Sequence, residues 1–447
     1  MKGRFAVRDV LKSCLIGWVA ACSSFSARSV ERSEPKGCPL LRIGLVSDTH
    51  VTPDPASCDR VRQAFEIFRR ESVDVVAHLG DLANYHQSEA YRNYRAAMDA
   101  VWPDRSKAPR FLYAWGNHDS IDYERRDKKD RQMDRAVAFA EMKRTLDIEH
   151  DLAWQTTVRG YTFLGVPEFP QDAWSQKTCR ERIEAACVGS PDRPVFFLHH
   201  PPARDTVDFT SNESVRFRRL LSEHPNVVAL NGHRHTSVMN ERSIWQGEYT
   251  AVEAACLYRW GGFDSNVTAR VYEAYGVMVM DVYGDHIGIH RFDVRDGSEF
   301  NPSARWSFPL PFDPKTAPYA AARRAAAERP GAFPRGSSVG LRCEGRGAAR
   351  RPVLRIPTVT HPETVCRYAV AVERRADEAW VPFAEASVTA DFYELPACRK
   401  GFVEAFVQAK LFTEPGEFRF AVRPIGFFGT VGERLTCSET FHKENGK

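Results

Sequence analysis

The sequence of 447 residues lacks several features that identify particular classes of protein. No internal apolar stretch approaches the roughly 20 residues of a membrane span. No two cysteines have zinc-ribbon spacing, and a Gly-x-Ser-x-Gly elbow is absent, which disfavours Ser-His-Asp catalysis. The net charge of +4 is too small to indicate nucleic-acid binding on its own. The sequence also contains no internal repeats.

The N-terminus is typical of an exported protein. Basic residues between positions 2 and 12 precede a short apolar segment, Cys14 to Ala21, and then small residues. This order predicts a secretory signal followed by a polar tether, together covering residues 1–39. Val19-Ala20-Ala21-Cys22 resembles the box before the acylated cysteine of bacterial lipoproteins. We therefore expect a periplasmic protein, with Cys22 as a candidate lipid anchor to the membrane, or a secreted one.

Cysteine usage is consistent with export. Of the nine cysteines after Cys22, four lie in the last part of the chain and could form two disulfides in an oxidising compartment: Cys343, Cys366, Cys398 and Cys437. The alternative is that they are buried free thiols. Because nine is odd, at least one thiol is unpaired, and Cys256 is the candidate since it lies in an apolar run.

Residues 40–295 alternate strand-like apolar runs with helical segments, which predicts an α/β layered domain. Apolar residues recur at helical spacing in Ser57–Glu71 and in Ala136–Leu146. Gly276–Val282 and Ile287–Phe292 are typical of a β-hairpin. The domain is therefore expected to end in antiparallel strands.

The rest of the chain has a different texture. Residues 296–338 are rich in Pro, Ala and Arg and are predicted to form a linker with one short helix, Ala317–Glu328. Residues 339–447 show short alternating strands, which predict a small all-β sandwich domain. Within it, Gly416–Arg423 and Phe427-Phe428-Gly429 resemble the closing strands of fibronectin type III domains.

Five short polar motifs each follow an apolar run that is typical of a buried strand. The runs are Leu41–Val46, Val73–Leu79, Phe111–Trp115, Val195–Leu198 and Val227–Leu230. The motifs are Ser47-Asp48-Thr49-His50, Gly80-Asp81, Gly116-Asn117-His118-Asp119, His199-His200 and Gly232-His233-Arg234-His235. Ligands of α/β sheets collect at the carboxyl ends of the strands. If the runs point the same way, the motifs meet at one edge.

Aspartate, histidine and asparagine side chains at strand ends are what a pair of metal ions needs. Seven candidate nitrogen and oxygen ligands, without any thiolate, follow the runs: Asp48, His50, Asp81, Asn117, His199, His233 and His235. Such a set suits Fe, Zn, Mn or Co and does not choose among them. Two ions about 3.5–4 Å apart can hold a shared hydroxide and clamp a phosphoryl group.

The five motifs, in this order over residues 43–235, resemble the calcineurin-like metallophosphoesterase superfamily, whose pattern is D-x-H, G-D, G-N-H-D/E, H and G-H-x-H. The resemblance implies a layered α/β/β/α metallophosphoesterase sandwich, here followed by the small all-β sandwich domain. It also implies two divalent or trivalent metal ions, Mn, Fe or Zn. The purple acid phosphatase branch has a tyrosine where this sequence has Asn84, so an iron–phenolate colour is not expected.

The resemblance assigns roles to individual residues. Asp48, His50 and His235 would bind the first metal, and Asn117, His199 and His233 the second. Asp81 would bridge the two metals. His118 would contact the phosphate and steady or protonate the leaving oxygen, and Asp119 would orient His118 by accepting a hydrogen bond from it.

The pair His199-His200 leaves an alternative open, because only one of the two can be the ligand. The family's ligand is the histidine two residues before the proline, which is His199 here. His200 would then face the substrate, together with Asn117 and His118, support a ligand from behind, or simply end its strand.

The function implied is hydrolysis of phosphate mono- or diesters by attack of a metal-bridging hydroxide. The motif combination is most similar to the branch with cyclic-nucleotide and glycerophosphodiester phosphodiesterases, so diesters are favoured. We expect a small-molecule or lipid phosphoester substrate, selected by loops 84–105, 119–135 and 255–270. One competitor is a nuclease of the same superfamily, for which a basic stripe is expected but not found. The other is a surface adhesion module that binds through the β-sandwich. The oligomeric state is not predicted.

Overall fold

The computed structural model describes residues 37–167, 175–209, 215–268 and 270–444. The described residues from Pro39 onward belong to one compact unit. The predicted signal, most of its tether and Cys22 lie outside the described residues. Within the described ranges, no helix combines the length and the apolar character that crossing a membrane requires.

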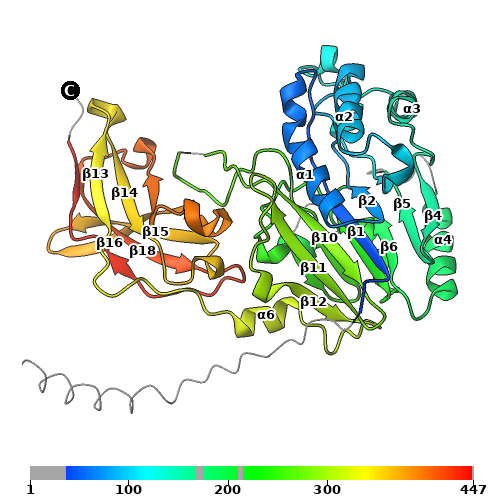
Figure 1. Cartoon of the computed structure of the whole chain (residues 1–447). Helices are drawn as coiled ribbons and strands as arrows, with labels where there is room; N and C mark the ends of the chain where they lie inside the picture. Colours follow the sequence, from blue (N-terminus) through cyan, green and yellow to red (C-terminus); the bar gives the residue numbers. More distant parts are fainter. Residues whose placement is uncertain (1–36, 168–174, 210–214, 269, 445–447) are drawn as a thin grey trace, which may run out of the picture. The chain divides into compact units, whose positions relative to one another are not determined.

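A first six-stranded sheet has the order β12-β11-β10-β1-β2-β3 (Figure 1). Its strands β1, β2 and β3 run parallel, whereas β10, β11 and β12 extend the sheet from β1 in antiparallel pairs. The bounds are β1 (Leu41–Val46), β2 (Val75–His78), β3 (Arg110–Tyr113), β10 (Gly276–Val282), β11 (His286–Asp293) and β12 (Trp306–Pro309). The predicted hairpin is therefore β10 and β11.

A second six-stranded sheet has the order β4-β5-β6-β7-β9-β8. Strands β5, β6, β7 and β9 are parallel, and β4 and β8 close the two edges in antiparallel pairs. The bounds are β4 (Trp154–Val158), β5 (Tyr161–Gly165), β6 (Val195–Leu198), β7 (Val227–Asn231), β8 (Ile244–Gln246) and β9 (Thr250–Glu253). The five apolar runs before the motifs are thus divided between two sheets.

The two sheets pack face to face, and helices cover both outer faces. Apolar residues of both sheets, such as Leu45 and Leu198, share one core. The helices on the first sheet are α1 (Asp59–Arg70), α2 (Ser88–Val101) and α3 (Arg135–Leu146), and those on the second are α4 (Gln176–Gly189) and α5 (Val215–Leu221). This order of layers confirms the predicted α/β/β/α fold.

Helix α1 shows why the sequence folds in this way. Its buried residues Val61, Ala64, Phe65 and Phe68 recur at helical spacing and form one apolar face. Phe68 packs directly over Gly44 of β1, where a side chain would collide with the ring. The small residue in the strand therefore allows close approach of helix and sheet.

The segment predicted as a linker, residues 296–338, contributes to the first sheet. Strand β12 alternates buried Trp306 and Phe308 with more exposed residues and pairs with β11. Only seven residues of the segment are helical, as α6 (Ala321–Ala327). This short edge strand was not predicted, because buried and more exposed residues alternate over just four positions in a Pro- and Arg-rich segment.

The C-terminal β region consists of two antiparallel sheets, as the all-β prediction requires. One sheet has the order β13-β14-β17 and the other β16-β15-β18-β19, with β20 paired to β18. The bounds are β13 (Gly340–Glu344), β14 (Arg351–Pro357), β15 (Arg367–Ala376), β16 (Ala379–Thr389), β17 (Phe402–Phe406), β18 (Gly416–Ile425), β19 (Leu435–Thr436) and β20 (Phe441–Lys443). A fibronectin type III identity and the domain boundaries remain predictions.

The two disulfides considered for this region are not present in the structure. The thiols of Cys343, Cys366, Cys398 and Cys437 are all free. Cys366 and Cys437 are buried and donate hydrogen bonds to backbone carbonyls, whereas Cys343 and Cys398 are exposed. The alternative of free thiols therefore holds for these cysteines, and Cys256 is also free and buried as expected.

A loop of the layered domain, residues 259–268, is held by the C-terminal β region. Ser265 exchanges two backbone hydrogen bonds with Ser387 of β16, at 2.9 and 3.0 Å. Asp264 accepts hydrogen bonds from the backbone and hydroxyl of Thr389, and Trp260 packs against Phe392 with ring centroids 5.7 Å apart. The core between the two sheets is continuous with that of the β region.

Candidate metal centre

The carboxyl ends of five strands bring the polar motifs together at one edge of the packed sheets. Strands β1, β2 and β3 of the first sheet, and β6 and β7 of the second, each lead directly into one motif. Donor atoms of Asp48, His50, Asp81 and His235 all lie within 4.8 Å of one another, and so do those of Asp81, His200 and His233. Asp81 belongs to both groups. The geometry therefore offers two adjoining metal sites that share one carboxylate.

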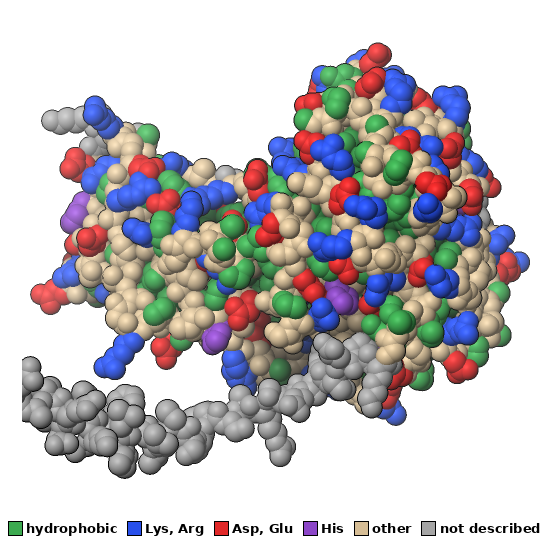
Figure 2. Space-filling model, in the orientation of Figure 1, with side chains coloured by type: hydrophobic (Ala, Val, Ile, Leu, Met, Phe, Trp, Pro, Cys, Tyr) green, Lys and Arg blue, Asp and Glu red, His purple; other side chains and the backbone are tan. Residues whose placement is uncertain are grey.

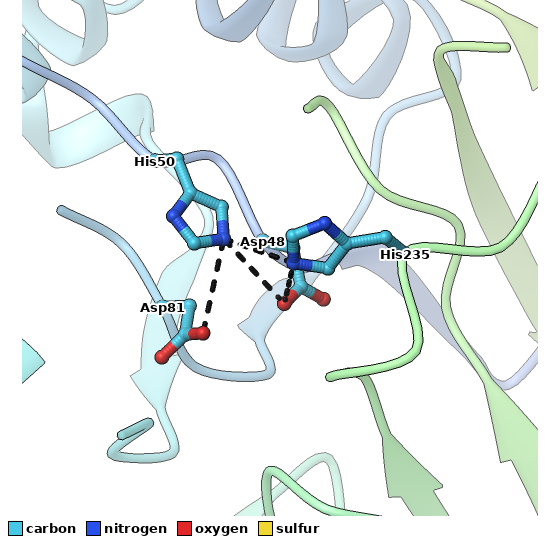
Figure 3. Close-up of side chains that lie close together, drawn as sticks. All are labelled: Asp48, His50, Asp81 and His235. Carbon is cyan, nitrogen blue, oxygen red and sulfur yellow. Dashed lines mark hydrogen bonds and ion pairs between the residues drawn. The ribbon is translucent and has the colours of Figure 1, made fainter. Parts of the chain in front are cut away.

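In the first group, the side chains point toward a common centre (Figure 3). Nε2 of His235 lies 3.1 Å from Oδ1 of Asp48 and 3.0 Å from Nε2 of His50. Nε2 of His50 lies 3.8 Å from Oδ2 of Asp81. Oδ1 of Asp48 is buried and accepts no hydrogen bond, while its Oδ2 accepts one from the backbone amide of His233. One oxygen is thus held by the backbone and the other is available to a cation.

In the second group, too, one carboxylate oxygen faces another donor and the other oxygen accepts a hydrogen bond from the backbone. Oδ2 of Asp81 lies 3.2 Å from Nε2 of His200, whereas Oδ1 accepts a hydrogen bond of 2.8 Å from the backbone amide of His118. Nδ1 of His233 lies 3.2 Å from Nε2 of His200 and 3.1 Å from Oδ1 of Asn117. Nitrogen and oxygen donors therefore converge without any thiolate, as transition-metal sites of mixed hardness require.

Hydrogen bonds from the far side of the rings orient three of the imidazoles. Nδ1 of His200 donates to the carbonyl of Leu79 at 2.7 Å, and Nδ1 of His235 donates to the carbonyl of Arg259 at 3.2 Å. Nδ1 of His50 lies 3.2 Å from the side-chain oxygen of Asn84. Because an oxygen acceptor keeps the hydrogen on Nδ1, each ring in its neutral form directs the Nε2 lone pair into the cluster.

The electrostatics of the cluster favour a cation. Burial lowers the pKa of His50 and of His233 to about 4, so both rings are neutral at neutral pH. Burial opposes ionisation of Asp48 and Asp81, but the neighbouring histidines hold the pKa of each carboxyl well below its usual range. Burial also opposes protonation of His200, yet the Asp81 carboxylate raises the pKa of His200 to about 10. Two ionised carboxylates buried this closely require positive charge beside them.

Three glycines leave the space that these ligands occupy. A side chain at Gly80 would collide with the imidazole of His200, and one at Gly116 with the carboxylate of Asp81. A side chain at Gly232 would collide with Ser47 and Asp48. The glycines in the motifs therefore have a steric role, because the ligands pass directly over the backbone of neighbouring strand ends.

The structure contradicts the choice of His199 over His200 as ligand. His200 is fully buried in the cluster, which also rules out the substrate-facing role considered for it. His199 lies against Phe217 of α5, with ring centroids 4.4 Å apart, and neither of its ring nitrogens has a hydrogen-bond partner. Side chains alternate along β6, so Phe197 and His199 face the helices while Leu198 and His200 face the other sheet.

The predicted hydrogen bond between His118 and the Asp119 carboxylate is also not formed. The buried Asp119 carboxylate accepts hydrogen bonds from the backbone amides of Asp81, Ala83 and Gly116, at 3.0–3.1 Å. Nδ1 of His118 donates instead to the carbonyl of Asn84 at 2.9 Å. Asp119 therefore holds the backbone of two motifs in place, and Asn84 orients His118.

Sequence reasoning missed two contributors to the site. Asn84 contacts His50 through its side chain and His118 through its carbonyl. Tyr258, in the loop after β9, packs against His50 with the rings tilted by 34° and their centroids 4.5 Å apart. The position of Asn84, three residues after Asp81, was a usable signal, whereas nothing in the sequence near Tyr258 marks it.

A family model described as calcineurin-like phosphoesterase matches residues 41–237, from the start of β1 to just beyond His235. Curated protein sequences gave no match. Three solved structures are similar over 62% of this chain: a dimetal phosphatase from Danio rerio (14% identity, 100% of that chain, TM-score 0.39), GAP50, described as the anchor in the inner membrane complex of Plasmodium (10%, 90%, 0.41), and purple acid phosphatase PPD1 from yellow lupin, Lupinus luteus (15%, 54%, 0.39).

The residues matched by the family model contain every motif that forms the cluster. The resemblance seen in the sequence is thereby confirmed. Residues 41–237 are therefore a calcineurin-like phosphoesterase domain.

Proposed function

We propose that this protein is a metal-dependent phosphoesterase that hydrolyses phosphate mono- or diesters, with diesters preferred. The observation that carries this proposal is that Asp81 belongs to two groups of converging donors, one with Asp48, His50 and His235 and the other with His200 and His233. Two metal ions bound there, Mn, Fe or Zn, would activate water and stabilise negative charge on the phosphoryl group. The combination of motifs supports the preference for diesters.

His118 is placed to act on the leaving group. Its ring lies beside that of His50, with centroids 4.7 Å apart, and Asn117 and His118 are both partly exposed. Because the Asn84 carbonyl accepts from Nδ1, the proton that a doubly protonated His118 would transfer to the departing oxygen is the one on Nε2, which leaves the neutral ring with its hydrogen on Nδ1. Asn117, His118 and His233 therefore form the part of the centre that a substrate can reach.

The test is an assay of the full chain reconstituted with Mn²⁺ against bis-p-nitrophenyl phosphate and p-nitrophenyl phosphate. We expect both to be hydrolysed, the diester with the higher kcat/KM, and a chelator to abolish both reactions. Failure of the metal-loaded protein to cleave either compound would overturn the proposal and favour a binding role for the C-terminal β region.

The two adjacent histidines provide a matched pair of variants. His200→Ala removes a donor from the cluster, so bound metal and turnover should fall by at least about 100-fold. His199→Ala removes a ring on the opposite face and should leave metal content and kcat within about threefold. Elemental analysis and the diester assay measure both, and the reverse pattern would restore the original assignment of His199.

A nuclease is the first competing function. On the face shown in Figure 2, Lys and Arg side chains are interspersed with Asp and Glu, so that face offers no uniform electrostatic track for a phosphate backbone. Single-stranded DNA and RNA, included in the same assay, test this alternative directly. Cleavage of either at a rate above that of the small diester would make the nuclease the better description.

We also propose that the protein is exported and acts on a small-molecule or lipid phosphoester. The basic and apolar N-terminal segment and Cys22 support this proposal. Fractionation of cells expressing the full chain, with and without Cys22→Ala, tests it. Export with membrane association that depends on Cys22 indicates a lipid anchor, export without it indicates a free protein, and recovery from the cytoplasm contradicts the proposal.

A further inference from the structure

An unbroken row of rings crosses the candidate metal centre. Tyr258 contacts His50, His50 contacts His118, and the ring centroid of His118 lies 6.4 Å from that of Tyr85. Tyr85 in turn contacts Tyr123, with centroids 5.9 Å apart. Each tyrosine comes from a different one of the three loops predicted to select the substrate. The row therefore continues from the metal ligands out to the surface on the His118 side.

The segments that carry Tyr85 and Tyr123 are fixed to each other. The backbone amide of His86 donates to the carbonyl of Ile121 at 2.8 Å, and a β-bridge joins His86 to Asp122. His86 is buried, with its ring nitrogens 2.9 Å from the hydroxyl of Tyr91 and 2.9 Å from the carboxylate of Glu141. Because each tyrosine adjoins one end of this bridge, their rings are held side by side by the fold.

The Tyr123 ring is presented at the surface rather than buried in a core. Its exposed fraction is 40%, and Tyr85 is half-buried. The guanidinium of Arg126 lies 4.2 Å from the centroid of Tyr123 and donates a hydrogen bond of 2.7 Å to its carbonyl, which holds one face of the ring. A pair of surface rings next to a polar reaction centre is the arrangement that binds planar groups.

Tyr258 differs from Tyr85 and Tyr123 in what its ring contacts. Its ring contacts His50 and also His235, with centroids 4.5 and 5.7 Å apart. Its ring therefore packs on two members of the metal cluster. Tyr258 supports the ligands, whereas Tyr85 and Tyr123 lie where the leaving group departs.

We propose that Tyr85 and Tyr123 form a subsite for a planar aromatic ring, either an aryl group or a nucleobase, on the leaving-group side of the substrate. This inference rests on the proposed phosphoesterase function, because His118 defines that side. The substrate class is a phosphoester that carries an aromatic group beyond the bond that breaks. Stacking between two rings and a planar group typically contributes about tenfold to binding.

The test compares binding of non-hydrolysable probes to the Mn²⁺-loaded full chain by calorimetry. Phenylphosphonate against methylphosphonate measures the aryl preference, and adenosine 5′-phosphorothioate against thiophosphate measures the nucleobase preference. We expect at least one aromatic probe to bind about tenfold more tightly than its partner. Tyr123→Leu, which changes an exposed residue, should reduce that ratio to about two or less, and Tyr85→Leu should do the same.

Three controls keep the outcome interpretable. Tyr85→Phe retains the ring and should retain the ratio. Tyr258→Leu should weaken metal binding without changing the ratio, and Tyr283→Leu, at the remote β10–β11 turn, should change neither. An unchanged ratio in both Tyr123→Leu and Tyr85→Leu, or no aromatic preference in the wild type, overturns the subsite.

The proposed function is tested separately by turnover of bis-p-nitrophenyl phosphate. A wild type that binds the aromatic probes through Tyr123 but hydrolyses nothing leaves the subsite standing and refutes the phosphoesterase. A wild-type protein that hydrolyses the diester without any aromatic preference supports the phosphoesterase function and refutes the subsite.

Discussion

At the edge of the packed sheets, five residues around the metal centre have left-handed backbone conformations: Asp48 (φ 50°), His50 (44°), Asp81 (53°), His233 (78°) and His235 (51°). In the C-terminal β region, within residues 339–444, Asp377 in the β15–β16 turn is the one non-glycine residue with positive φ. Each such residue typically costs about 1–3 kcal/mol. The first region thus accepts conformational strain to direct polar side chains inward, and the second does not.

The two regions also differ in what they bury. The metal-facing edge buries a cluster of carboxylates and imidazoles, several without hydrogen-bond partners. The β region buries mainly rings and aliphatic side chains, and its buried carboxylates, Glu373 and Asp391, are isolated from each other in the sequence. The comparison teaches that stability and chemistry are separated within one compact unit. A change at the metal-facing edge should therefore affect turnover more than folding, and a change in the β region should do the reverse.

The largest effect expected is on turnover, at His118. His118→Ala should keep the metal content, because His118 is absent from both donor groups, yet it should lower kcat by roughly 10²–10⁴. The melting temperature should change little. Elemental analysis, diester kinetics and a thermal melt measure the three quantities. Unchanged kcat on a diester with a poor leaving group would reject the role of His118 as proton donor.

The matching change in the β region is Phe418→Ala. Phe418 is fully buried, and its ring lies 5.0 Å from those of Phe383 and Phe412. Removing it should lower the free energy of unfolding by about 3–5 kcal/mol, a factor of about 10²–10⁴ in the folding equilibrium. The kcat of the folded protein should stay within about twofold.

Val381→Ala on β16 is the control for this change, because Val381 is 39% exposed and should cost less than about 0.5 kcal/mol. Urea denaturation measures both variants. If kcat fell in step with stability in Phe418→Ala, the separation of the two regions would be refuted.

A smaller effect is expected at Asn84, which contacts two histidines through different atoms. Asn84→Ala removes the side-chain acceptor for His50 but leaves the carbonyl that orients His118. Metal affinity should fall about 10–100-fold, while kcat at saturating metal should change little. Asn84→Asp keeps an acceptor oxygen and should restore most of the affinity. A fall in saturated kcat without loss of metal affinity would contradict this account.

The smallest effect expected is a pH dependence of the free energy of unfolding, which arises at His290, away from the metal centre and from the β region. Burial opposes protonation of His290 on β11, but hydrogen bonds to Asp281 and Glu299 raise the pKa of His290 to about 9. Because this folded-state pKa exceeds the usual value near 6.5, the stabilisation is complete below pH 6.5 and is lost as pH rises toward 9. Urea denaturation should show a loss on the order of 1 kcal/mol, which His290→Gln removes. If the free energy of unfolding of His290→Gln fell equally with pH, the pH dependence would come from another group.

Much of the layered fold could be predicted from apolar runs. Leu41–Val46 and Val195–Leu198 are the observed bounds of β1 and β6, and five motifs behind five strands were sufficient to anticipate where the ligands meet. The division of those strands between two sheets could not be predicted, because strands buried on both faces carry no mark of which neighbour they pair with.

The same limit explains the error at His199 and His200. All four residues of β6 are buried, so the pattern of apolar residues does not reveal which side chains face the helices and which face the other sheet. The role of Asp119 was missed for a related reason. A carboxylate that accepts from three backbone amides depends on how loops close around it, and sequence spacing does not contain that information.

The loop of residues 259–268 connects the metal-facing edge with the C-terminal β region. The carbonyl of Arg259 accepts from His235, while farther along the same loop Ser265 pairs with Ser387 and Phe263 donates to Thr389. The C-terminal β region thus supports the loop that orients His235 in the metal centre. A protein that lacks only the C-terminal β region would lose that support, present Trp260 to water, and free the backbone that sets the angle of the His235 imidazole.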